Sequence, residues 1–409
     1  MIFKAILDVK RLIYNTLGDV FKLRKPQKDF FIEIMFLFLS INSRLNFLQF
    51  GRYGKYGEQR YRQQFEKHFD FLNFNKEITI THGSGKYIIA FDPSYISKSG
   101  KKTPGLDKFW SGVAGQAKLG LEIGGIAAVD IENNTAFHLE AVQTPTYQDL
   151  EDRGMNLLDW YADCIIQRKD TLLSLSKYLI ADAYFPKKPF VDKILDDADM
   201  HFISRLRNDA DLMYLYKGKP TGEKGRPKKY SGKINLKDID KDYFELLYED
   251  AQVPVYTAIV YSKALKRNIK LVYEQLKGNK KKSYLLFFST DTKQDAQEIL
   301  KYYKKRFQIE FLYRDGKQHT GLNDCQARSE NKLHFHFNAS LTAINLAKVE
   351  HWLSVPKDER GAFSMADVKT MYHNALLLER FIEVFAVRPN KLKNNNNVKK
   401  LINFGKIAA

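Results

Sequence analysis

The stretch YYKKRFQIEFLYRDGK at positions 302–317 points to the fold, because it is predicted to form one helix that gathers four chemically distinct side chains. On a helix, spacings of three, seven and fourteen residues place these side chains within a sector of roughly 60°. They are Tyr303, Arg306, Glu310 and Lys317. This face can hold a phosphate backbone while its carboxylate binds a metal ion. An amphipathic basic helix with a solvated face fits the same pattern.

Two upstream aspartates end apolar runs. In KYIIAFDPSY (86–95) the run ends at Asp92, before a proline that disfavours continuing a central strand. In KYLIADAYFPKKPF (177–190) a second run reaches Asp182 shortly before the turn-like PKKP. An aspartate at a strand end is by itself usually a turn or helix cap, so neither residue alone indicates a site.

Together these residues resemble a known family. The spacing Tyr-x2-Arg-x3-Glu-x6-Lys is similar to the Y-R-E-K signature of bacterial insertion-sequence DDE transposases, a cut-and-paste group with an RNase H-like catalytic domain. The order and approximate separations of the two aspartates and Glu310 also match. The resemblance implies that Asp92, Asp182 and Glu310 bind the metal ions. It implies further that Tyr303, Arg306 and Lys317 hold DNA near the transposon end.

Asp130 is a competing candidate for the second metal ligand, because it also ends an apolar strand, LGLEIGGIAAVD (119–130). As part of a hairpin it would lie near a turn at Asn133. The family resemblance falls on Asp182, which is therefore the preferred ligand.

The chemistry of phosphodiester cleavage explains why carboxylates are needed. An attacking water or 3′-hydroxyl must be activated and a leaving oxyanion stabilised, and two hard cations about 3.5–4 Å apart do both. Mg²⁺ prefers oxygen ligands and keeps several waters, so three carboxylates are enough to hold two Mg²⁺ ions, with Mn²⁺ as a substitute. We find no Ser-His-Asp or Cys-His arrangement in the sequence, which agrees with a reaction that uses no protein nucleophile.

The charge balance indicates a polyanionic partner. The chain has 66 Lys and Arg against 48 Asp and Glu, a formal charge of +18 and a pI of about 9.4, so a nucleic acid is the expected partner. A ribosomal or membrane-surface protein could share this balance, whereas the family resemblance implies double-stranded DNA. Its 409 residues, 44% of them hydrophobic, can bury a core and suggest two or three domains. Cys164 and Cys325 form no metal or redox spacing, which favours a reduced cytosolic setting.

The sequence predicts neither a membrane span nor a targeting segment. The most apolar run, FFIEIMFLFLSI (30–41), contains Glu33 and is too short to cross a bilayer. The N-terminus MIFKAILDVKRLIY is interrupted by charges and lacks a signal-peptide core. We therefore expect a soluble, cytoplasmic protein. The family resemblance implies a bacterial, nucleoid-associated enzyme that acts as a homodimer on DNA.

The patterns divide the chain into five parts. An N-terminal helical region contains NFLQFGRYGKYGEQRYRQQF (46–65), whose interleaved basic and aromatic residues suit DNA contacts, although a solvated helical surface is an alternative. An RNase H-like α/β core follows, interrupted by a β-rich insertion and completed by the helix of Glu310. The expected parts are a helical DNA-binding domain (1–84), the first part of the core (85–207), the insertion (208–282), the second part of the core (283–350), and a C-terminal helical region with a basic tail (351–409).

Several elements are predicted within the core and the insertion. A hairpin is expected around Asn133 and Asn134, followed by one helix from Gln148 to Ser176. YLIADAYF then gives a strand, PFVDKILDDA a helix and HFISRL another strand. In the insertion, VPVYTAIVY and RNIKLVYEQL alternate with period two, which predicts paired strands. KKSYLLFFSTD (281–291) returns as a strand before the helix of Glu310.

The run EKGRPKKYSGK (223–233) in the insertion has a Gly-Arg-Pro centre between lysines. Such a segment can lie extended in a minor groove, where arginine is attracted to the narrow, negative A·T-rich form. We expect DNA contacts from Arg226, Lys228 and Lys229, with a solvated loop as the alternative.

Other aromatic and histidine residues are given structural roles. His334 and His336 diverge on the helix that their surroundings predict, so a shared metal site is disfavoured. Trp110 follows a basic loop and could stack on a base, but burial in the core is the expected state.

The sequence therefore predicts a DDE transposase that binds terminal inverted repeats, cleaves the ends and transfers the 3′-hydroxyl into target DNA. The same carboxylates would also serve a two-metal endonuclease that cuts without joining. A non-catalytic DNA-binding derivative is the third alternative, against which the intact Asp-Asp-Glu set argues.

Overall fold

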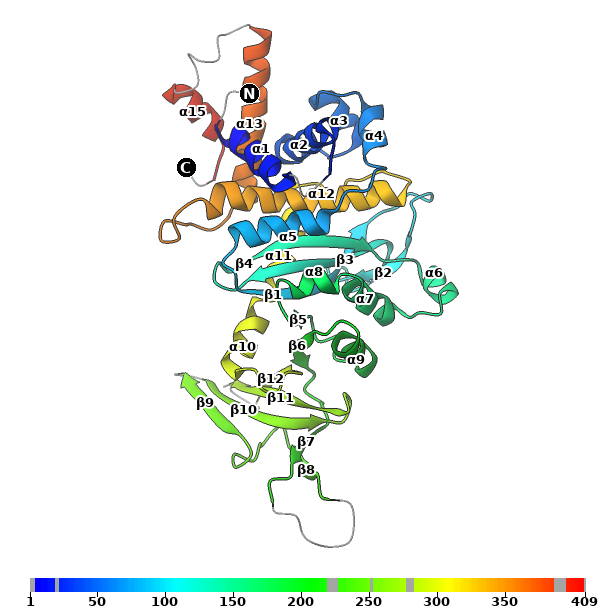
Figure 1. The fold of residues 1–409 in the computed structure, drawn as a ribbon, viewed down its shortest axis with the longest axis vertical. Coiled ribbons are helices and arrows are strands. Elements are labelled where there is room, and N and C mark those ends of the chain that lie inside the picture. Colours follow the sequence, from blue (N-terminus) through cyan, green and yellow to red (C-terminus); the bar gives the residue numbers. More distant parts are fainter. Residues whose placement is uncertain are drawn as a thin grey trace.

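The structure is a computed structural model, which describes residues 4–18, 22–218, 227–250, 253–276, 283–385 and 395–407. Helices gather at one end of the long axis and antiparallel strands at the other, with a mixed α/β region between them (Figure 1).

The central region is built on five strands in the order β4-β3-β1-β5-β6. The first three are antiparallel and the last three parallel. Their bounds are β1 Tyr87–Ser97, β3 Gln116–Asp130, β4 Thr135–Gln143, β5 Tyr178–Ile180 and β6 His201–Leu206. A short β2, Asp107–Ser111, pairs with the start of β3. With helices on both faces, this mixed sheet has the arrangement of an RNase H-like fold, and the predicted fold class is confirmed.

Helices cover the two faces of this sheet with two hydrophobic cores. One face carries α7 (Leu157–Ile166) and α9 (Lys188–Asp196), whose apolar side chains pack on alternate residues of β1 such as Ile89 and Phe91. The other face carries the N-terminal helices together with α11 and α12, and buries Ile88 and Ala90. This division follows from the period of two in a strand that is apolar on both sides.

The N-terminal region is helical, as predicted, and it lies against the core. Its helices are α1 Lys4–Leu17, α2 Lys25–Ser40, α3 Phe47–Tyr53, α4 Glu58–Gln64 and α5 Phe71–His82. The long helix α12 (Glu330–Lys348) and α5 both pack on β4, while α13 (Met365–Val384) packs on α2. A π-helical turn, η1 Val349–Leu353, continues α12, and α15 (Asn396–Asn403) lies near the C-terminus (Figure 1).

The strands of the predicted insertion extend the same sheet beyond β6. Strand β12 (Ser283–Ser289) pairs antiparallel with β6, and the order continues β12-β11-β10-β7-β8, with β9 paired to β10. The bounds are β7 Leu212–Leu215, β8 Tyr230–Lys233, β9 Glu245–Asp250, β10 Val253–Ser262 and β11 Arg267–Leu276. The predicted pairing of VPVYTAIVY with RNIKLVYEQL is confirmed as the β10–β11 hairpin.

The predicted hairpin around Asn133 and Asn134 is also confirmed. Strands β3 and β4 pair antiparallel, and Asn134 adopts a left-handed backbone conformation with φ of 52°. Asparagine tolerates this region better than most residues, which explains the turn at this position.

Strand β1 does not end at Pro93, as the sequence suggested. It continues to Ser97, and Pro93 lies opposite Gly124 of β3. The parallel partner β5 pairs only with Ile89 and Ala90, so beyond that point one edge of β1 has no neighbouring strand. A proline is tolerated there because no ladder hydrogen bond is required on that side.

Two helix predictions were wrong in extent. The single helix expected from Gln148 to Ser176 is three short helices: α6 Tyr147–Asp152, α7 Leu157–Ile166 and α8 Lys169–Leu173. Gly154, at φ of 66°, ends the first, and Asn156 caps the second. The stretch 302–317 is likewise two helices, α10 Ala296–Lys305 and α11 Gln308–His319, which meet at Arg306 and Phe307.

Trp110 is 63% exposed on β2, so the expectation of a buried tryptophan was wrong. It lies on a five-residue strand whose burial pattern alternates, on the outward side. Within the described residues, no helix is long and apolar enough to cross a membrane.

Candidate active site

The register of the parallel strands brings Asp92 and Asp182 together. Ile89 pairs with Leu179 and Ala90 with Ile180, where β5 ends, and Asp182 follows close enough to Asp92 for its charge to raise the Asp92 pKa. Neighbouring strands lie about 4.8 Å apart, and both residues belong to the sheet face on which α11 packs. Two carboxylates therefore meet where β1 and β5 separate.

The backbone after β5 is fixed by a residue that the sequence analysis missed. The buried hydroxyl of Ser204, on β6, donates to the carbonyl oxygens of Ala181 at 2.9 Å and Asp182 at 2.8 Å. The Asp182 Oδ1 atom accepts a hydrogen bond from the backbone N–H of Tyr184 at 2.9 Å. These contacts hold the Asp182 carboxylate at the sheet edge.

Arg306 joins the third carboxylate to this pair. Its guanidinium lies 3.7 Å from Asp92 Oδ1 and 2.8 Å from Glu310 Oε1. Glu310 is in the first turn of α11, and its side chain is 53% exposed, whereas that of Arg306 is only 14% exposed. Although the helix is interrupted, the break at Arg306 keeps the four-residue spacing to Glu310. The two residues therefore still meet as the sequence predicted.

Asp92 is largely buried, and neighbouring charged side chains shift its pKa. The pKa of Asp92 is raised to about 7, chiefly by burial; the Arg306 charge lowers it, and the charges of Asp182 and Glu310 raise it. The Nε atom of Arg306 is itself buried and has no hydrogen-bond partner among the described residues. The site thus concentrates negative charge that one guanidinium offsets only in part.

Tyr303 and Lys317 flank the carboxylates. The Tyr303 ring packs on Phe287, with ring centroids 4.9 Å apart, and lies 5.9 Å from the Arg306 guanidinium. Lys317 Nζ donates to Ser94 Oγ at 2.9 Å, two residues along β1 from Asp92. Burial lowers the pKa of Lys317, and the Asp92 charge opposes that change. All four residues of the opening stretch therefore lie near Asp92, in the middle of β1, with Tyr303 also packed against β12.

A close contact between α11 and β3 positions this group. The Tyr313 hydroxyl donates to the carbonyl oxygen of Asp92. Gly125 lies opposite Asp92 in the register, and a Cβ at Gly125 would be only 2.0 Å from the Tyr313 oxygen. The Gly124-Gly125 pair inside an apolar strand was a sequence signal of such an approach.

The competing aspartate has a different surrounding. Asp130 is fully buried and accepts four hydrogen bonds, from the N–H and hydroxyl of Ser84 and from the backbone and side-chain amides of Asn133. Each of its oxygens accepts one hydrogen bond from Ser84, which precedes β1, and one from Asn133 in the β3–β4 turn, the turn that the hairpin pattern implied.

The predicted DNA contacts of the insertion lie far from this site. Lys228 and Lys229 are exposed beside β8, and Lys228 Nζ lies 5.2 Å from the Tyr216 ring centroid. Seven strand spacings separate β1 from β8, or about 34 Å at 4.8 Å each. Arg226 lies outside the described residues.

The histidines of α12 have structural partners. His334 Nε2 lies 3.2 Å from Glu140 Oε1, and His336 Nε2 lies 2.8 Å from the carbonyl oxygen of Gly321. The helical expectation is confirmed. Within the described ranges, no three His, Cys, Asp or Glu side chains converge closely enough to form a ready metal-ligand cluster.

The oxygen donors nevertheless suit a hard divalent cation. Asp92, Asp182 and Glu310 are all carboxylates, and Asp92 is largely buried, within reach of the charges of the other two. A cation bound here would reduce the repulsion among the three carboxylates, which Arg306 offsets only in part.

A comparison with family models identifies this region. Residues 161–346, a little under half of the chain, match the transposase DDE domain, and the match includes Asp182 and Glu310 but not Asp92. No curated protein matched the sequence. The transposase domain match, on an RNase H-like sheet, supports a DDE transposase family for this chain.

Proposed function

We propose that this chain is an insertion-sequence transposase of the Y-R-E-K type. It would bind the terminal inverted repeats of its element, cleave the ends and transfer the freed 3′-hydroxyl into target DNA. The observation that supports this proposal is that the charges of Asp182 and Glu310 both act on Asp92, while Arg306 pairs with Asp92 and Glu310. The family match over residues 161–346 supports the same conclusion, since it implies a polynucleotidyl transferase or endonuclease.

Asp92, Asp182 and Glu310 would hold two Mg²⁺ ions, for which Mn²⁺ could substitute. When bound, such ions activate the attacking oxygen and stabilise the leaving oxyanion. The protein residues have separate tasks. Ser204 and Tyr313 fix the backbone at Asp182 and Asp92, so the carboxylates keep their places.

Tyr303, Arg306 and Lys317 would position DNA beside the carboxylates. Arg306 is the residue best placed to respond to DNA, because its guanidinium pairs with two carboxylates and could instead make bidentate contacts to a phosphate. Lys317 would place a positive charge for a phosphate beside Ser94, two residues after Asp92 on β1. Lys228 and Lys229 would contact DNA about one helical turn away, since about 34 Å matches the repeat of the duplex. Arg226, outside the described residues, is proposed as a further DNA contact from its sequence.

The proposal includes the assembly and setting of the protein. Two copies would bridge two element ends as a homodimer, in the cytoplasm of a bacterium and in association with its nucleoid. The expected domain limits at residues 84, 207, 282 and 350 are part of the same proposal.

The decisive experiment uses the DNA that flanks the coding region. Duplexes ending in its short inverted repeats are incubated with the protein and Mg²⁺, and nicking at the repeat ends is measured. A pre-cut end and a supercoiled plasmid then test joining. Cutting with joining supports a transposase, and cutting alone indicates the endonuclease alternative. Binding without either reaction at any Mg²⁺ or Mn²⁺ concentration would refute the enzymatic proposal.

A further inference from the structure

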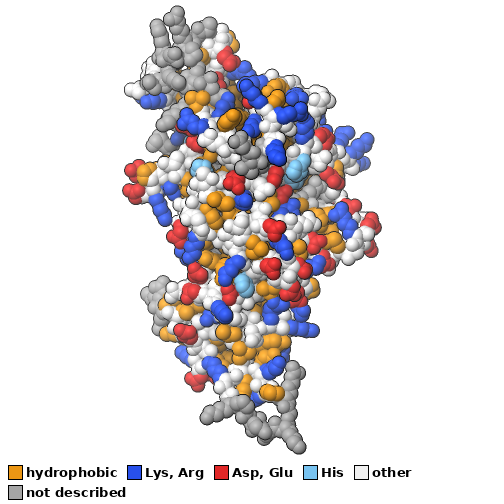
Figure 2. Space-filling model, viewed as in Figure 1, with side chains coloured by type: hydrophobic (Ala, Val, Ile, Leu, Met, Phe, Trp, Pro, Cys, Tyr) orange, Lys and Arg blue, Asp and Glu red, His pale blue; other side chains and the backbone are white. Residues whose placement is uncertain are grey.

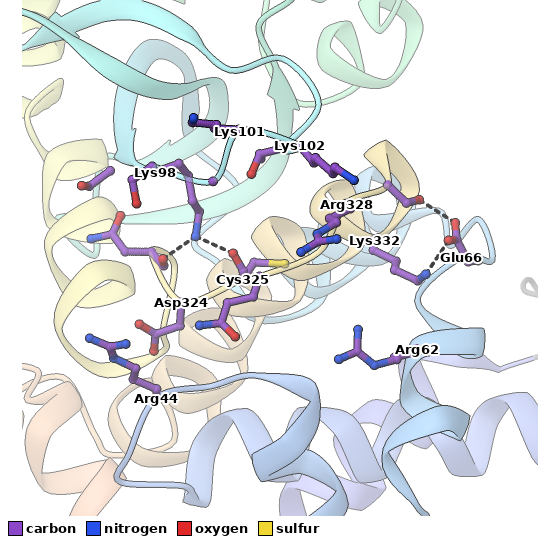
Figure 3. Close-up of a pocket in the computed structure, with 17 residues that line it drawn as sticks. Arg44, Arg62, Glu66, Lys98, Lys101, Lys102, Asp324, Cys325, Arg328 and Lys332 are labelled. Atoms are coloured by element: carbon purple, nitrogen blue, oxygen red, sulfur yellow. Dashed lines mark hydrogen bonds and ion pairs between the residues drawn. The ribbon is translucent and has the colours of Figure 1, made fainter.

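We propose that a cationic groove beside the N-terminal helices binds the phosphodiester backbone of DNA at a distance from the candidate active site. The inference rests on the proposed function and adds a binding site to it. The groove is a cavity of about 1130 Å³ between three walls: the loop after β1, the N-terminal segments around α4, and the stretch from Asn323 to Lys332 (Figure 3).

The lining of the groove fits a nucleic acid backbone better than a small molecule. Small-molecule pockets are mostly apolar and measure about 300–1,000 Å³. This cavity is larger, and the described residues that line it include no aliphatic or aromatic side chain. Its cations are Arg44, Arg62, Lys98, Lys101, Lys102, Arg328 and Lys332. Without an aromatic platform for bases, the groove is built for phosphates, so its contribution should not depend on sequence.

The acidic side chains of the groove are already engaged. Glu66 accepts from Lys332 Nζ at 2.7 Å and from the Ser329 hydroxyl at 2.7 Å. The carboxylate of Asp324 accepts from the backbone N–H of Leu45 at 2.9 Å. These contacts tie the N-terminal region to the third wall, so the two carboxylates hold the groove together.

Four cations remain available for a ligand. Within the described part of the chain, Arg44, Lys101, Lys102 and Arg328 have no carboxylate within ion-pair distance. Figure 3 shows their side chains coming from different walls around one space. Lys98 instead donates to the carbonyl oxygens of Asn323 and Cys325, each at 2.5 Å, and so fixes the loop after β1 to the third wall.

The groove lies at the C-terminal end of β1, the strand that contains Asp92 of the candidate active site. Lys98 follows the end of β1, six residues after Asp92, which corresponds to about 20 Å along a strand. Lys317 lies between them, at Ser94. A strand of DNA rises about 3.4 Å per nucleotide, so the groove would hold phosphates about six nucleotides from the cleaved bond.

The test measures the salt dependence of binding with the full chain. The variant Lys101→Ala/Lys102→Ala is compared with Lys101→Arg/Lys102→Arg, which keeps the charges, and with Lys169→Ala/Lys357→Ala, which removes two cations elsewhere. Affinity for a random-sequence duplex of about 30 base pairs, or three helical turns, is followed by fluorescence anisotropy. The slope of log K against log[salt] is negative, and each lost phosphate contact reduces its magnitude by about 0.9, so the alanine pair should make it shallower by about 1.8.

A second arm locates the contact. Neutral methylphosphonates are placed about six nucleotides from the cleavage site of an inverted-repeat duplex. They should weaken binding by the wild-type protein and have little further effect on Lys101→Ala/Lys102→Ala. If the methylphosphonates weaken binding equally in both proteins, Lys101 and Lys102 do not contact the phosphates about six nucleotides from the cleavage site.

The outcomes separate this inference from the proposed function. If the alanine pair keeps the slope of the control pair while the wild-type protein cleaves DNA, the groove inference is wrong and the function stands. If the slope becomes shallower as expected but Mg²⁺ supports no cleavage, the groove stands as a DNA site and the enzymatic proposal is wrong. A loss confined to one DNA sequence would contradict backbone recognition.

Discussion

At the scale of single residues, Arg306 connects the evidence for the site. Its guanidinium pairs with Asp92 and Glu310, which come from elements more than two hundred positions apart in the chain. The positive charge of Arg306 reduces the repulsion between the Asp92 and Glu310 carboxylates. Arg306 can therefore both hold the carboxylates in place and meet an incoming phosphate.

We expect Asp182→Asn to abolish cleavage while end binding changes little. The substitution keeps the size and the hydrogen bond from the Tyr184 N–H but removes the charge that a metal ion needs. Nicking should fall by more than about 100-fold, as for the loss of a direct metal ligand. Asp130→Asn is the matched control. The Asp130 carboxylate accepts four hydrogen bonds, and the substitution replaces one of its two oxygens with an amide group that can only donate. Asp130→Asn should therefore cost about 1–3 kcal/mol in the free energy of unfolding and leave nicking by the folded fraction intact. Cleavage by Asp182→Asn but not Asp130→Asn would reverse the assignment.

Glu310→Gln should bind DNA normally and fail to cut at ordinary Mg²⁺ concentrations. Arg306→Ala and Lys317→Ala should show the opposite balance, with assembly of the cleavage-competent complex weakened by about tenfold each, or about 1.4 kcal/mol. End binding and nicking are measured separately for all three. Wild-type nicking by Glu310→Gln, or wild-type behaviour of both cation variants in both assays, would mean that this face of α10 and α11 is only a solvated surface.

At the scale of elements, the contact between α11 and β3 determines where the Glu310 helix sits. Gly125→Ala would place a methyl group 2.0 Å from the Tyr313 hydroxyl oxygen, so either the ring or the helix must move. We expect a loss of about 1–3 kcal/mol in the free energy of unfolding, as for other overpacked cores. Tyr313→Phe should cost less, about 1 kcal/mol for its hydrogen bond. In urea unfolding the double variant should lose less than the sum of the two, and strict additivity would contradict the contact.

Another contact between elements predicts a pH dependence of stability. Burial lowers the pKa of Lys369, on α13, from the usual 10.5 to about 7, and its Nζ donates to the carbonyl oxygen of Phe38 on α2. Below about pH 7 both the folded and unfolded states hold this proton, and the folded state carries the full cost of burying a charge. Between about pH 7 and 10.5 only the unfolded state holds it, so the contribution to stability rises with pH at up to about 1.4 kcal/mol per pH unit.

Lys369→Met tests this contribution, because it removes the titrating group and keeps an unbranched side chain. The free energy of unfolding in urea is measured at pH 7, 8 and 9 for both proteins. The difference between wild type and variant should change in favour of the wild type as the pH rises. A constant difference would show that Lys369 does not titrate in this range.

At the scale of the whole molecule, the excess of 18 positive charges predicts the behaviour of the DNA complex. Basic side chains gather at the upper right of the molecule, over α3 and α4, near one wall of the cationic groove (Figure 2). With at least about six phosphates neutralised, the slope of log K against log[salt] should be steeper than about −5. A slope near −1 in the anisotropy titration would indicate that most of these cations face solvent.

The arrangement of the sheet also acts at this scale. Strands β7 to β11 extend the core sheet through β12 and do not form a separate layer. The basic residues beside β8 are therefore held about 34 Å from Asp92 on a continuous hydrogen-bonded support. A duplex lying along the sheet could reach both places.

The sequence by itself determined the succession of the core strands along the chain, the β3–β4 and β10–β11 hairpins and the helical N-terminal region, because period-two alternation, turn residues and helical spacing are local properties of the chain. It also singled out the carboxylates from which the proposed site is built. Where it was wrong, longer-range contacts prevailed. Pro93 stays within β1 because β5 is too short to pair there, and Trp110 is exposed because β2 presents it outward.

Only the tertiary structure decided how those carboxylates meet. The register of β1 with β5, the pairing of Arg306 across the break between α10 and α11, and the close approach of Tyr313 to Gly125 each join segments distant in sequence. The same holds for the cationic groove, whose walls come from three separate stretches. Such contacts depend on how whole elements pack, and the local spacing of residues carries no record of that packing.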